Sequence, residues 1–165
     1  MTSQVSVIEL TLDQWERYRD IRIQALTHDG DAFGGNLAEE SQYSQSQWQE
    51  KAAQYVGILA EVNGEDVGFM SVENLKGDFG ATCWIGSCWV SPSIRGKGVL
   101  TSLFAHLDSK AEERDWGIQG LGVWVTNTGA IAAYEKIGFA SIGEPSESTR
   151  KPGTFYQRMI RESTY

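Results

Sequence analysis

The hydrophobic period of the chain changes between residues 81 and 111, and this change strongly limits the folds that the chain can adopt. Residues 81–90 (ATCWIGSCWV) form an apolar run of strand length. One face of a helix follows, with apolar residues at i, i+3, i+4, i+7 and i+11: Leu100, Leu103, Phe104, Leu107 and Ala111. A short apolar run at 121–125 comes next. A strand, a helix and a strand in this order predict a helical crossover between two strands of one sheet.

The other segments predict a sheet that is mostly antiparallel. Residues 55–62 and 66–73 flank Asn63-Gly64, a dipeptide typical of a two-residue hairpin because both positions tolerate positive φ. Further strands are predicted at 4–10, 139–142 and 155–160, and further helices after an N-cap at Asp13, over 39–53, and from the N-cap Asn127 to Gly138. Hairpins in the first half and helical crossovers in the second predict an α+β fold: a mixed, mostly antiparallel sheet of about seven strands flanked by about four helices.

Length and composition exclude several classes of protein. The chain has 165 residues, which fits a single domain over 1–165. Its net charge of −8 argues against nucleic acid or an anionic membrane as a partner, because both require a basic surface. The two cysteines, Cys83 and Cys88, provide no disulfide framework, and with only two histidines no metal site is predicted. No apolar segment is long enough to span a bilayer and the first residues are unlike a signal peptide, so a cytoplasmic location is expected.

A candidate anion site lies in the segment 90–104 (VSPSIRGKGVLTSLF), where a predicted strand ends and the amphipathic helix begins. The first N–H groups of a helix lack partners within the helix, and the helix dipole adds partial positive charge there. Gly96 and Gly98 have no side chain that would keep a phosphate away, and Arg95 and Lys97 add formal charge. The segment therefore predicts a cradle for an anion, with a pyrophosphate as the favoured ligand.

Two common phosphate-binding motifs do not fit this segment. A Walker loop requires Ser or Thr after its lysine, where this chain has Gly98. A dinucleotide fingerprint requires a third glycine, where this chain has Thr101. What remains is Arg-x-x-Gly-x-(Gly/Ala) after a strand ending in Val-x-Pro, and this pattern resembles the coenzyme-A-binding motif of the GNAT superfamily of acyl-CoA-dependent N-acetyltransferases. Residues 121–139 (LGVWVTNTGAIAAYEKIGF) are similar to a second motif of that family, with these residues at the family spacing: Asn127, Ala130, Tyr134, Gly138 and Phe139.

The resemblance implies a role for each residue that matches the family motifs. The end of the fourth strand, Trp89 and Val90, would pair its backbone with the pantetheine arm of the cosubstrate acetyl-CoA. Asn127 would hydrogen-bond the same arm, and Tyr134 would lie near the sulfur and protonate the departing thiolate as general acid. No metal is implied. The pyrophosphate would be held mainly by main-chain N–H groups of Arg95, Gly96, Lys97, Gly98, Val99, Leu100 and Thr101.

Two features depart from the family pattern. Leu100 stands where the family usually has Gly or Ala; its main-chain N–H is retained, and its side chain is predicted to point into the core with the rest of the apolar helix face. The fourth and fifth strands offer no acid to serve as general base. Glu73, Asp31, Glu40 and a water chain held by backbone carbonyls are the candidates for that role.

The implied reaction is transfer of an acetyl group from acetyl-CoA to a primary amine of a small molecule or peptide. In the family the acceptor binds between the loop that joins the first two helices and the last hairpin, which here are residues 28–40 and 143–153. These segments carry more acidic than basic residues, which suits a cationic amine. The alternative is a non-catalytic acyl-CoA-binding sensor or regulatory module, motivated by Leu100 and the missing acid. Formation of a homodimer stays open.

Overall fold

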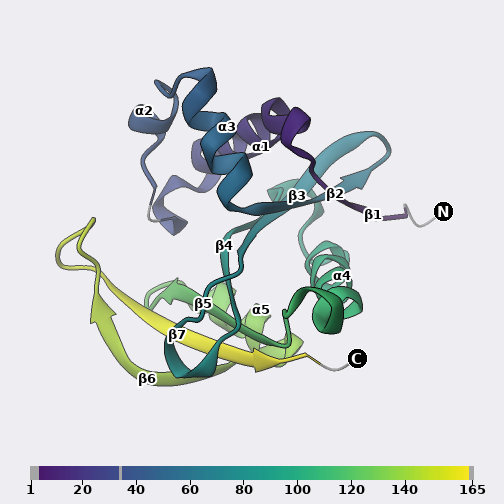
Figure 1. The fold of residues 1–165 in the computed structure, drawn as a ribbon. Coiled ribbons are helices and arrows are strands. Elements are labelled where there is room, and N and C mark those ends of the chain that lie inside the picture. Colours follow the sequence, from purple (N-terminus) through teal and green to yellow (C-terminus); the bar gives the residue numbers. More distant parts are fainter. Residues whose placement is uncertain (1–3, 34, 164–165) are drawn as a thin grey trace. The chain divides into compact units, whose positions relative to one another are not determined.

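The computed structural model describes residues 4–33 and 35–163, and within them the chain forms seven strands and five α-helices (Figure 1). The strands follow the order β1-β2-β3-β4-β5-β7-β6. This confirms the predicted α+β fold with a mixed sheet, and one helix more than expected is present. The strands are β1 (Ser6–Glu9), β2 (Val56–Val62), β3 (Glu65–Glu73), β4 (Cys83–Val90), β5 (Ile118–Trp124), β6 (Ala140–Glu147) and β7 (Phe155–Glu162). The helices are α1 (Trp15–Asp29), α2 (Leu37–Glu40), α3 (Gln45–Gln54), α4 (Val99–Arg114) and α5 (Thr128–Ile137).

The chain divides into two compact units. The first comprises the residues up to Glu73 together with Ser87–His106, and the second comprises Asn74–Gly86 and the residues from Leu107 onward. Strand β4 and helix α4 are therefore each divided between the two units. The predicted single domain over 1–165 stays a prediction.

The predicted hairpin forms the centre of the first unit. Strands β2 and β3 pair antiparallel around Asn63 and Gly64, whose φ values of 53° and 82° confirm a turn with two left-handed positions. Leu59 lies opposite Phe69. Because side chains alternate along a strand, the Leu59 and Phe69 side chains share one face of the hairpin, and those of the adjacent pairs lie on the other face.

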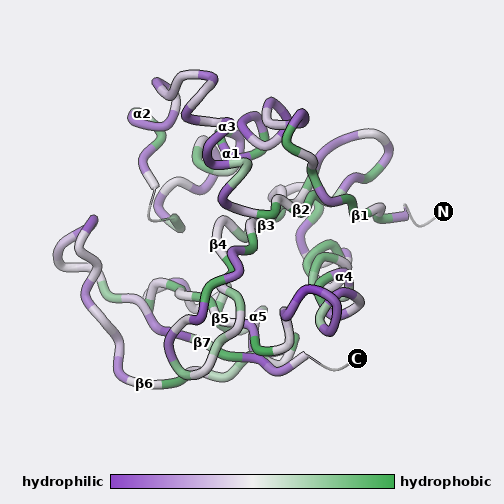
Figure 2. The backbone as a smooth tube through the Cα atoms, viewed as in Figure 1, coloured by the Kyte–Doolittle hydropathy of each residue, from purple (hydrophilic) through white to green (hydrophobic). Residues whose placement is uncertain are grey.

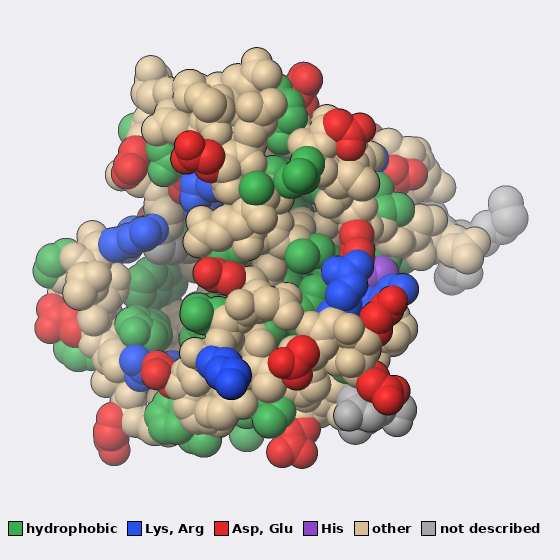
Figure 3. Space-filling model, viewed as in Figure 1, with side chains coloured by type: hydrophobic (Ala, Val, Ile, Leu, Met, Phe, Trp, Pro, Cys, Tyr) green, Lys and Arg blue, Asp and Glu red, His purple; other side chains and the backbone are tan. Residues whose placement is uncertain are grey.

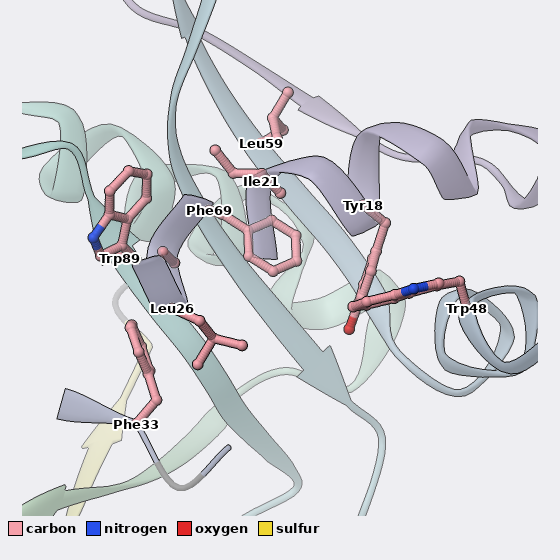
Figure 4. Close-up of a cluster of buried hydrophobic side chains, with 9 residues drawn as sticks. Tyr18, Ile21, Leu26, Phe33, Trp48, Leu59, Phe69 and Trp89 are labelled. Atoms are coloured by element: carbon pink, nitrogen blue, oxygen red, sulfur yellow. The ribbon is translucent and has the colours of Figure 1, made fainter. Parts of the chain in front are cut away.

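Helices α1 and α3 cover one side of this hairpin with apolar side chains (Figure 4). The Tyr18 ring meets the Phe69 ring edge to face at 5.1 Å between centroids, and Trp48 from α3 lies 6.4 Å from Tyr18. Leu59 and Trp89 belong to the same buried cluster. Aromatic packing of this kind fixes α1 on the sheet and so positions the segment that follows α1.

The first half of α4 packs close to β3 at Gly68. A Cβ atom on Gly68 would lie only 2.8 Å from Val99 Cγ1, so glycine is required for this approach. Figure 2 shows hydrophobic residues in the first half of α4 and hydrophilic residues toward its end. The predicted apolar face is confirmed from Leu103 onward, but Leu100 is only half buried, whereas Val99 is 1% exposed. Val99 therefore occupies the first fully buried position of the helix, and the prediction that Leu100 points into the core stays a prediction.

The second unit is built on β5, β6 and β7. Strand β7 pairs antiparallel with both β5 and β6, and the first part of β4 pairs parallel with β5, as the predicted crossover requires. Arg161 on β7 donates to both carboxylate oxygens of Asp108 at 2.7 and 2.6 Å, to Gln119 at 3.0 Å, and to the Ile137 carbonyl at 2.9 Å. This network satisfies buried polar groups and ties the end of α5 to β7.

Two details of the N-terminal helices differ from the prediction. Asp13 is not the N-cap of α1: a 3-10 turn over Leu12–Gln14 comes first, and the Gln14 side chain accepts the Thr11 N–H at 2.9 Å. The helix predicted over 39–53 is two helices, because Ser44 and Gln47 form a reciprocal capping box that starts α3 anew. A 3-10 turn over Gly30–Ala32 follows α1 in the segment 28–40, and Gly34 lies outside the described residues.

Strand β6 is longer than the predicted 139–142. The register shifts between Ile142 and Ser146, and the Gln157 side chain donates to the carbonyls of Ile142 and Gly143 at 3.0 and 3.2 Å. With Gly143 at φ 74°, this bulge lets the chain resume pairing with β7 after Pro145. The connecting loop is therefore shorter than the sequence indicated.

Candidate functional site

The predicted anion cradle lies in the first unit, between β4 and α4. A 3-10 turn over Pro92–Ile94 follows β4, and α4 begins at Val99. Gly96 and Gly98 have φ values of 78° and 87°, and a Cβ built on either would meet no atom within 4 Å. Glycine is therefore needed here for its backbone conformation, and it leaves space in front of the loop.

The start of α4 presents main-chain donors next to this space. The Ser102 N–H donates to the Gly98 carbonyl at 3.0 Å, which is the first hydrogen bond of the helix. The N–H groups of Val99, Leu100 and Thr101 precede that bond and are donors without an intrahelical acceptor. Together with the helix dipole and the exposed Lys97, they suit an anionic group such as a pyrophosphate.

Arg95 does not project freely into the cradle. Its Nη2 donates to Asp29 Oδ2 at 2.6 Å, and its Nε donates to the Val90 carbonyl at 2.9 Å. Trp89 Nε1 donates to the same Asp29 oxygen at 2.7 Å. Burial opposes ionisation of Asp29, but the bonds from Trp89 and Arg95 outweigh it and lower the pKa of this carboxyl group. The carboxylate thus joins the end of α1 to the end of β4 and to the glycine turn.

The Trp89 side chain is part of the buried core. It is 3% exposed, and the His28 ring stacks against it at 6.1 Å with an interplanar angle of 21°. Only the backbone of Trp89 is thus placed to bind a ligand. The Val90 carbonyl already accepts a bond from Arg95, so a ligand strand would pair with the other backbone groups of these two residues.

A buried ion pair that the sequence analysis missed lies next to β4. Arg22 on α1 donates to both carboxylate oxygens of Glu40 at 2.9 and 3.0 Å, and its Nη1 donates to the Ser87 hydroxyl at 2.9 Å. Ser87 has a φ of 54°, a strained value for a residue with a side chain, inside the strand. Gly35 packs so closely on the pair that a Cβ there would lie 2.2 Å from Glu40 Oε2. One signal was available: Arg22 interrupts the apolar helical spacing of Tyr18, Ile21 and Ala25.

The three candidate bases have different surroundings. Glu40 is 3% exposed and committed to Arg22, so protonating it would leave a buried guanidinium without its counter-charge. Glu73 lies at the end of β3, where the Gln54 side chain approaches it at 3.5 Å. Asp31 is exposed on the turn after α1. This geometry argues against Glu40 as a base and leaves Asp31, Glu73 and a water chain as candidates.

The second motif lies on α5 in the second unit. Asn127 is confirmed as the N-cap, because its side-chain oxygen accepts the Ala130 N–H at 3.3 Å. Capping uses the oxygen, so the NH2 group is still a donor for a ligand. Gly138, at φ 116°, ends the helix as predicted. Tyr134 is half buried, and its ring meets Phe139 at 5.8 Å with a 65° interplanar angle, so it is not simply a core residue.

Several acidic residues expected to face a cationic acceptor are already paired. Asp29 binds Arg95, Glu40 binds Arg22, and Glu147 accepts the Gly153 N–H at 2.9 Å. Asp31, Glu39 and Glu144 are exposed. Figure 3 shows Asp and Glu side chains spread over one face with Lys and Arg between them. The structure therefore gives the cationic preference less support than the acidic composition of these segments suggested.

Cys83 and Cys88 form no disulfide, and burial raises the pKa of the Cys83 thiol to about 12, so this thiol is protonated at neutral pH. Among residues 4–33 and 35–163, no three His, Cys, Asp or Glu side chains are grouped so that they could hold a metal ion. In the same residues no helix has the length and apolar character needed to cross a membrane.

Comparison with known proteins identifies the family. Residues 15–139 match the Acetyltransferase (GNAT) family, and the chain belongs to it. Over 87 residues it is 34% identical to an uncharacterized N-acetyltransferase of Methanocaldococcus jannaschii. That match covers 50% of this chain and only 38% of the relative's length.

Solved structures show the same fold at low sequence identity. A ribosomal-protein-alanine N-acetyltransferase from Brucella melitensis gives a TM-score of 0.69 at 20% identity, over 95% of this chain and 99% of that one. A putative acetyltransferase from Salmonella typhimurium, solved with its cofactor acetyl-CoA, gives 0.70 at 18% identity, over 99% and 96%. A protein from Streptococcus mutans gives 0.73 at 15% identity, over 96% and 99%. At these identities the neighbours show that the chain has the fold of these proteins.

Proposed function

We propose that this protein transfers an acetyl group from acetyl-CoA to a primary amine of a small molecule or peptide. The observation that carries the proposal is the glycine turn at the start of α4. Its positive φ values, its open space and the main-chain donors behind it fit the pyrophosphate of coenzyme A. Membership of the GNAT family supports acetyl-CoA over other phosphate-containing ligands.

The family motifs assign a role to each residue in this proposal. The N–H groups of Val99, Leu100 and Thr101 bind the pyrophosphate together with the turn before them. The backbone of Trp89 and Val90 and the NH2 group of Asn127 bind the pantetheine arm. Acetyl-CoA supplies an activated thioester that the acceptor amine attacks directly, and Tyr134 gives a proton to the sulfur as it leaves.

The acceptor amine must be neutral when it attacks. An alkyl amine with a pKa of ~10.4 is neutral in about one molecule of 2,500 at pH 7, so deprotonation contributes up to about 4–5 kcal/mol of the barrier. Asp31, Glu73 or a water chain held by backbone carbonyls removes this proton. Of these, Asp31 belongs to the segment after α1 that the family uses for the acceptor.

Acetyl-CoA is expected to stabilise the folded protein, because it binds the native cradle and has no site on the unfolded chain. At one hundred times its dissociation constant it should add about 2.7 kcal/mol to the free energy of unfolding, and so raise the melting temperature. Differential scanning fluorimetry with acetyl-CoA, NAD and ATP measures this. An unchanged melting curve at millimolar acetyl-CoA, or equal shifts with all three ligands, would contradict the cosubstrate assignment.

Catalysis is separated from mere binding by a thiol-release assay with a panel of amines. An acetyltransferase releases free CoA at a rate that depends on the amine, whereas a sensor or regulatory module is stabilised by acetyl-CoA without releasing CoA. The panel includes small amines, amino acids and a peptide with a free N-terminus. The amine with the highest kcat/KM then defines the acceptor class.

The Tyr134→Phe variant is expected to lower the turnover number by about 10–100-fold. The variant removes one hydroxyl and keeps the ring contact with Phe139. Full general acid catalysis contributes about 10²–10⁴-fold, but a thiol with a pKa near ~8.5 is already a fair leaving group, which favours the lower end. Single-turnover rates measured with the best amine test this.

The melting temperature of the same variant distinguishes the other roles of Tyr134. A packing ring predicts an unchanged rate and equal or higher stability. A structural hydrogen bond from the hydroxyl predicts a loss of about 1 kcal/mol in stability with turnover preserved. An undiminished rate would remove Tyr134 from the mechanism.

A further inference from the structure

We propose that Asp29 is a positioning residue for acetyl-CoA, which it serves by holding Arg95 and Trp89 in place beside the glycine turn. The inference rests on the proposed function, since it assumes that this turn binds coenzyme A. It assigns Arg95 a different role from the one its charge suggests. The Arg95 side chain acts as a brace for the turn and makes no essential contact with phosphate.

The hydrogen bonds around Asp29 support this role. A single carboxylate oxygen, Oδ2, accepts from Arg95 Nη2 at 2.6 Å and from Trp89 Nε1 at 2.7 Å. A second nitrogen of the same guanidinium is used as well, because Arg95 Nε donates to the Val90 carbonyl at 2.9 Å. The planar guanidinium of Arg95 is therefore held by two acceptors, the Asp29 carboxylate and the Val90 carbonyl.

The position of the carboxylate is itself fixed. Asp29 is the last residue of α1, and the Trp89 ring that it binds is buried in the core cluster and stacked on His28. Neither partner can shift far without disturbing that cluster. The Arg95 side chain, in contrast to the Trp89 ring, is exposed, with 48% of it accessible.

The glycine turn needs such a brace. Gly96 and Gly98 have no side chains that could hold the turn by packing, and a Cβ on either would touch nothing within 4 Å. Glycine also has more conformational freedom to lose than any other residue. Holding the residue immediately before Gly96 reduces the entropy that ligand binding would otherwise have to remove.

The Asp29→Asn variant distinguishes the two roles of Arg95, because the two roles predict different changes in the affinity for coenzyme A. If Arg95 is a phosphate ligand, Asp29 competes for it, and Asp29→Asn should leave coenzyme A affinity unchanged or increase it. If Arg95 is a brace, Asp29→Asn should weaken binding much as Arg95→Ala does. We expect a dissociation constant about 5–30-fold higher in each variant, which corresponds to fixing about one backbone residue.

The decisive experiment is isothermal titration calorimetry with coenzyme A on the full chain. The variants are Asp29→Asn, Arg95→Ala and the double variant. Because both changes remove the same interaction, the double variant should lose no more affinity for coenzyme A than the weaker-binding of the two single variants. Arg95→Lys should rescue only part of the affinity, since an ammonium cannot reach Asp29 and the Val90 carbonyl with the same planar geometry. The surface pair of Arg19 and Asp20 on the same helix, bonded at 2.9 Å, provides the matched controls Arg19→Ala and Asp20→Asn, with unchanged affinity expected.

The outcomes distinguish this inference from the proposed function. Wild-type protein that does not bind coenzyme A would overturn the proposed function. Wild-type binding with unchanged or tighter binding by Asp29→Asn would overturn the positioning role alone, as would losses that multiply in the double variant. If Asp29→Asn melts at a much lower temperature, the variants Arg95→Ala and Arg95→Lys test the positioning role instead, because the Arg95 side chain is exposed. Equal affinities of the wild type and Arg95→Ala for coenzyme A would then overturn the positioning role.

Discussion

Replacing Glu40 with alanine is expected to lower the free energy of unfolding by about 3–5 kcal/mol, because it leaves a buried charge without its partner. The Arg22 guanidinium is surrounded by the first unit, and its Cζ atom lies 5.5 Å from the centroid of the Phe33 ring. The lost contacts are two charge-assisted hydrogen bonds of 2.9 and 3.0 Å. Urea unfolding followed by circular dichroism measures the change.

The neighbouring Glu39 provides the control for this experiment. It lies on the same helix and is exposed, so Glu39→Ala should change stability by no more than about 0.5 kcal/mol. Replacing both partners, as in Arg22→Met with Glu40→Leu, should restore much of the stability, because no unpaired charge remains. Equal effects of Glu39→Ala and Glu40→Ala would show that the ion pair does not hold the first unit together.

The elements that were predicted correctly are those fixed by local chemistry. Asn63-Gly64 dictates a hairpin turn because both residues accept positive φ, and Asn127 and Gly138 mark the two ends of α5. The elements that were missed depend on reciprocal side-chain contacts. Neither the Thr11–Gln14 box nor the Ser44 cap changes the hydrophobic period. A prediction from periodicity alone therefore misplaced the start of α1 and joined α2 and α3 into one helix.

The candidate site follows the same division. The glycine turn and the start of α4 could be predicted because Gly96 and Gly98 stand directly before an apolar helical face. The engagement of Arg95 by Asp29 could not, since the two residues are 66 positions apart and their pairing depends on how α1 packs. Sequence spacing identifies where a ligand can approach, whereas packing decides which charged side chains are still available to bind it.

Replacing Gly98 with valine is expected to weaken acetyl-CoA binding by at least about 100-fold. The branched side chain would fill the space in front of the turn and oppose its φ of 87°. Loss of two charge-assisted hydrogen bonds to phosphate, about 1.5–3 kcal/mol each, accounts for a change of this size. Calorimetric titration with acetyl-CoA measures it.

Gly64→Val is the matched control, because Gly64 has nearly the same φ of 82° and equally open surroundings in the β2–β3 turn. Both variants should lose similar stability, about 1–2 kcal/mol from the positive φ, but only Gly98→Val should lose binding. Arg95→Ala is expected to cost less affinity than Gly98→Val, since main-chain N–H groups supply most of the contacts. Normal affinity in Gly98→Val together with lost affinity in Arg95→Ala would show that charge, rather than the helix N-terminus, holds the ligand.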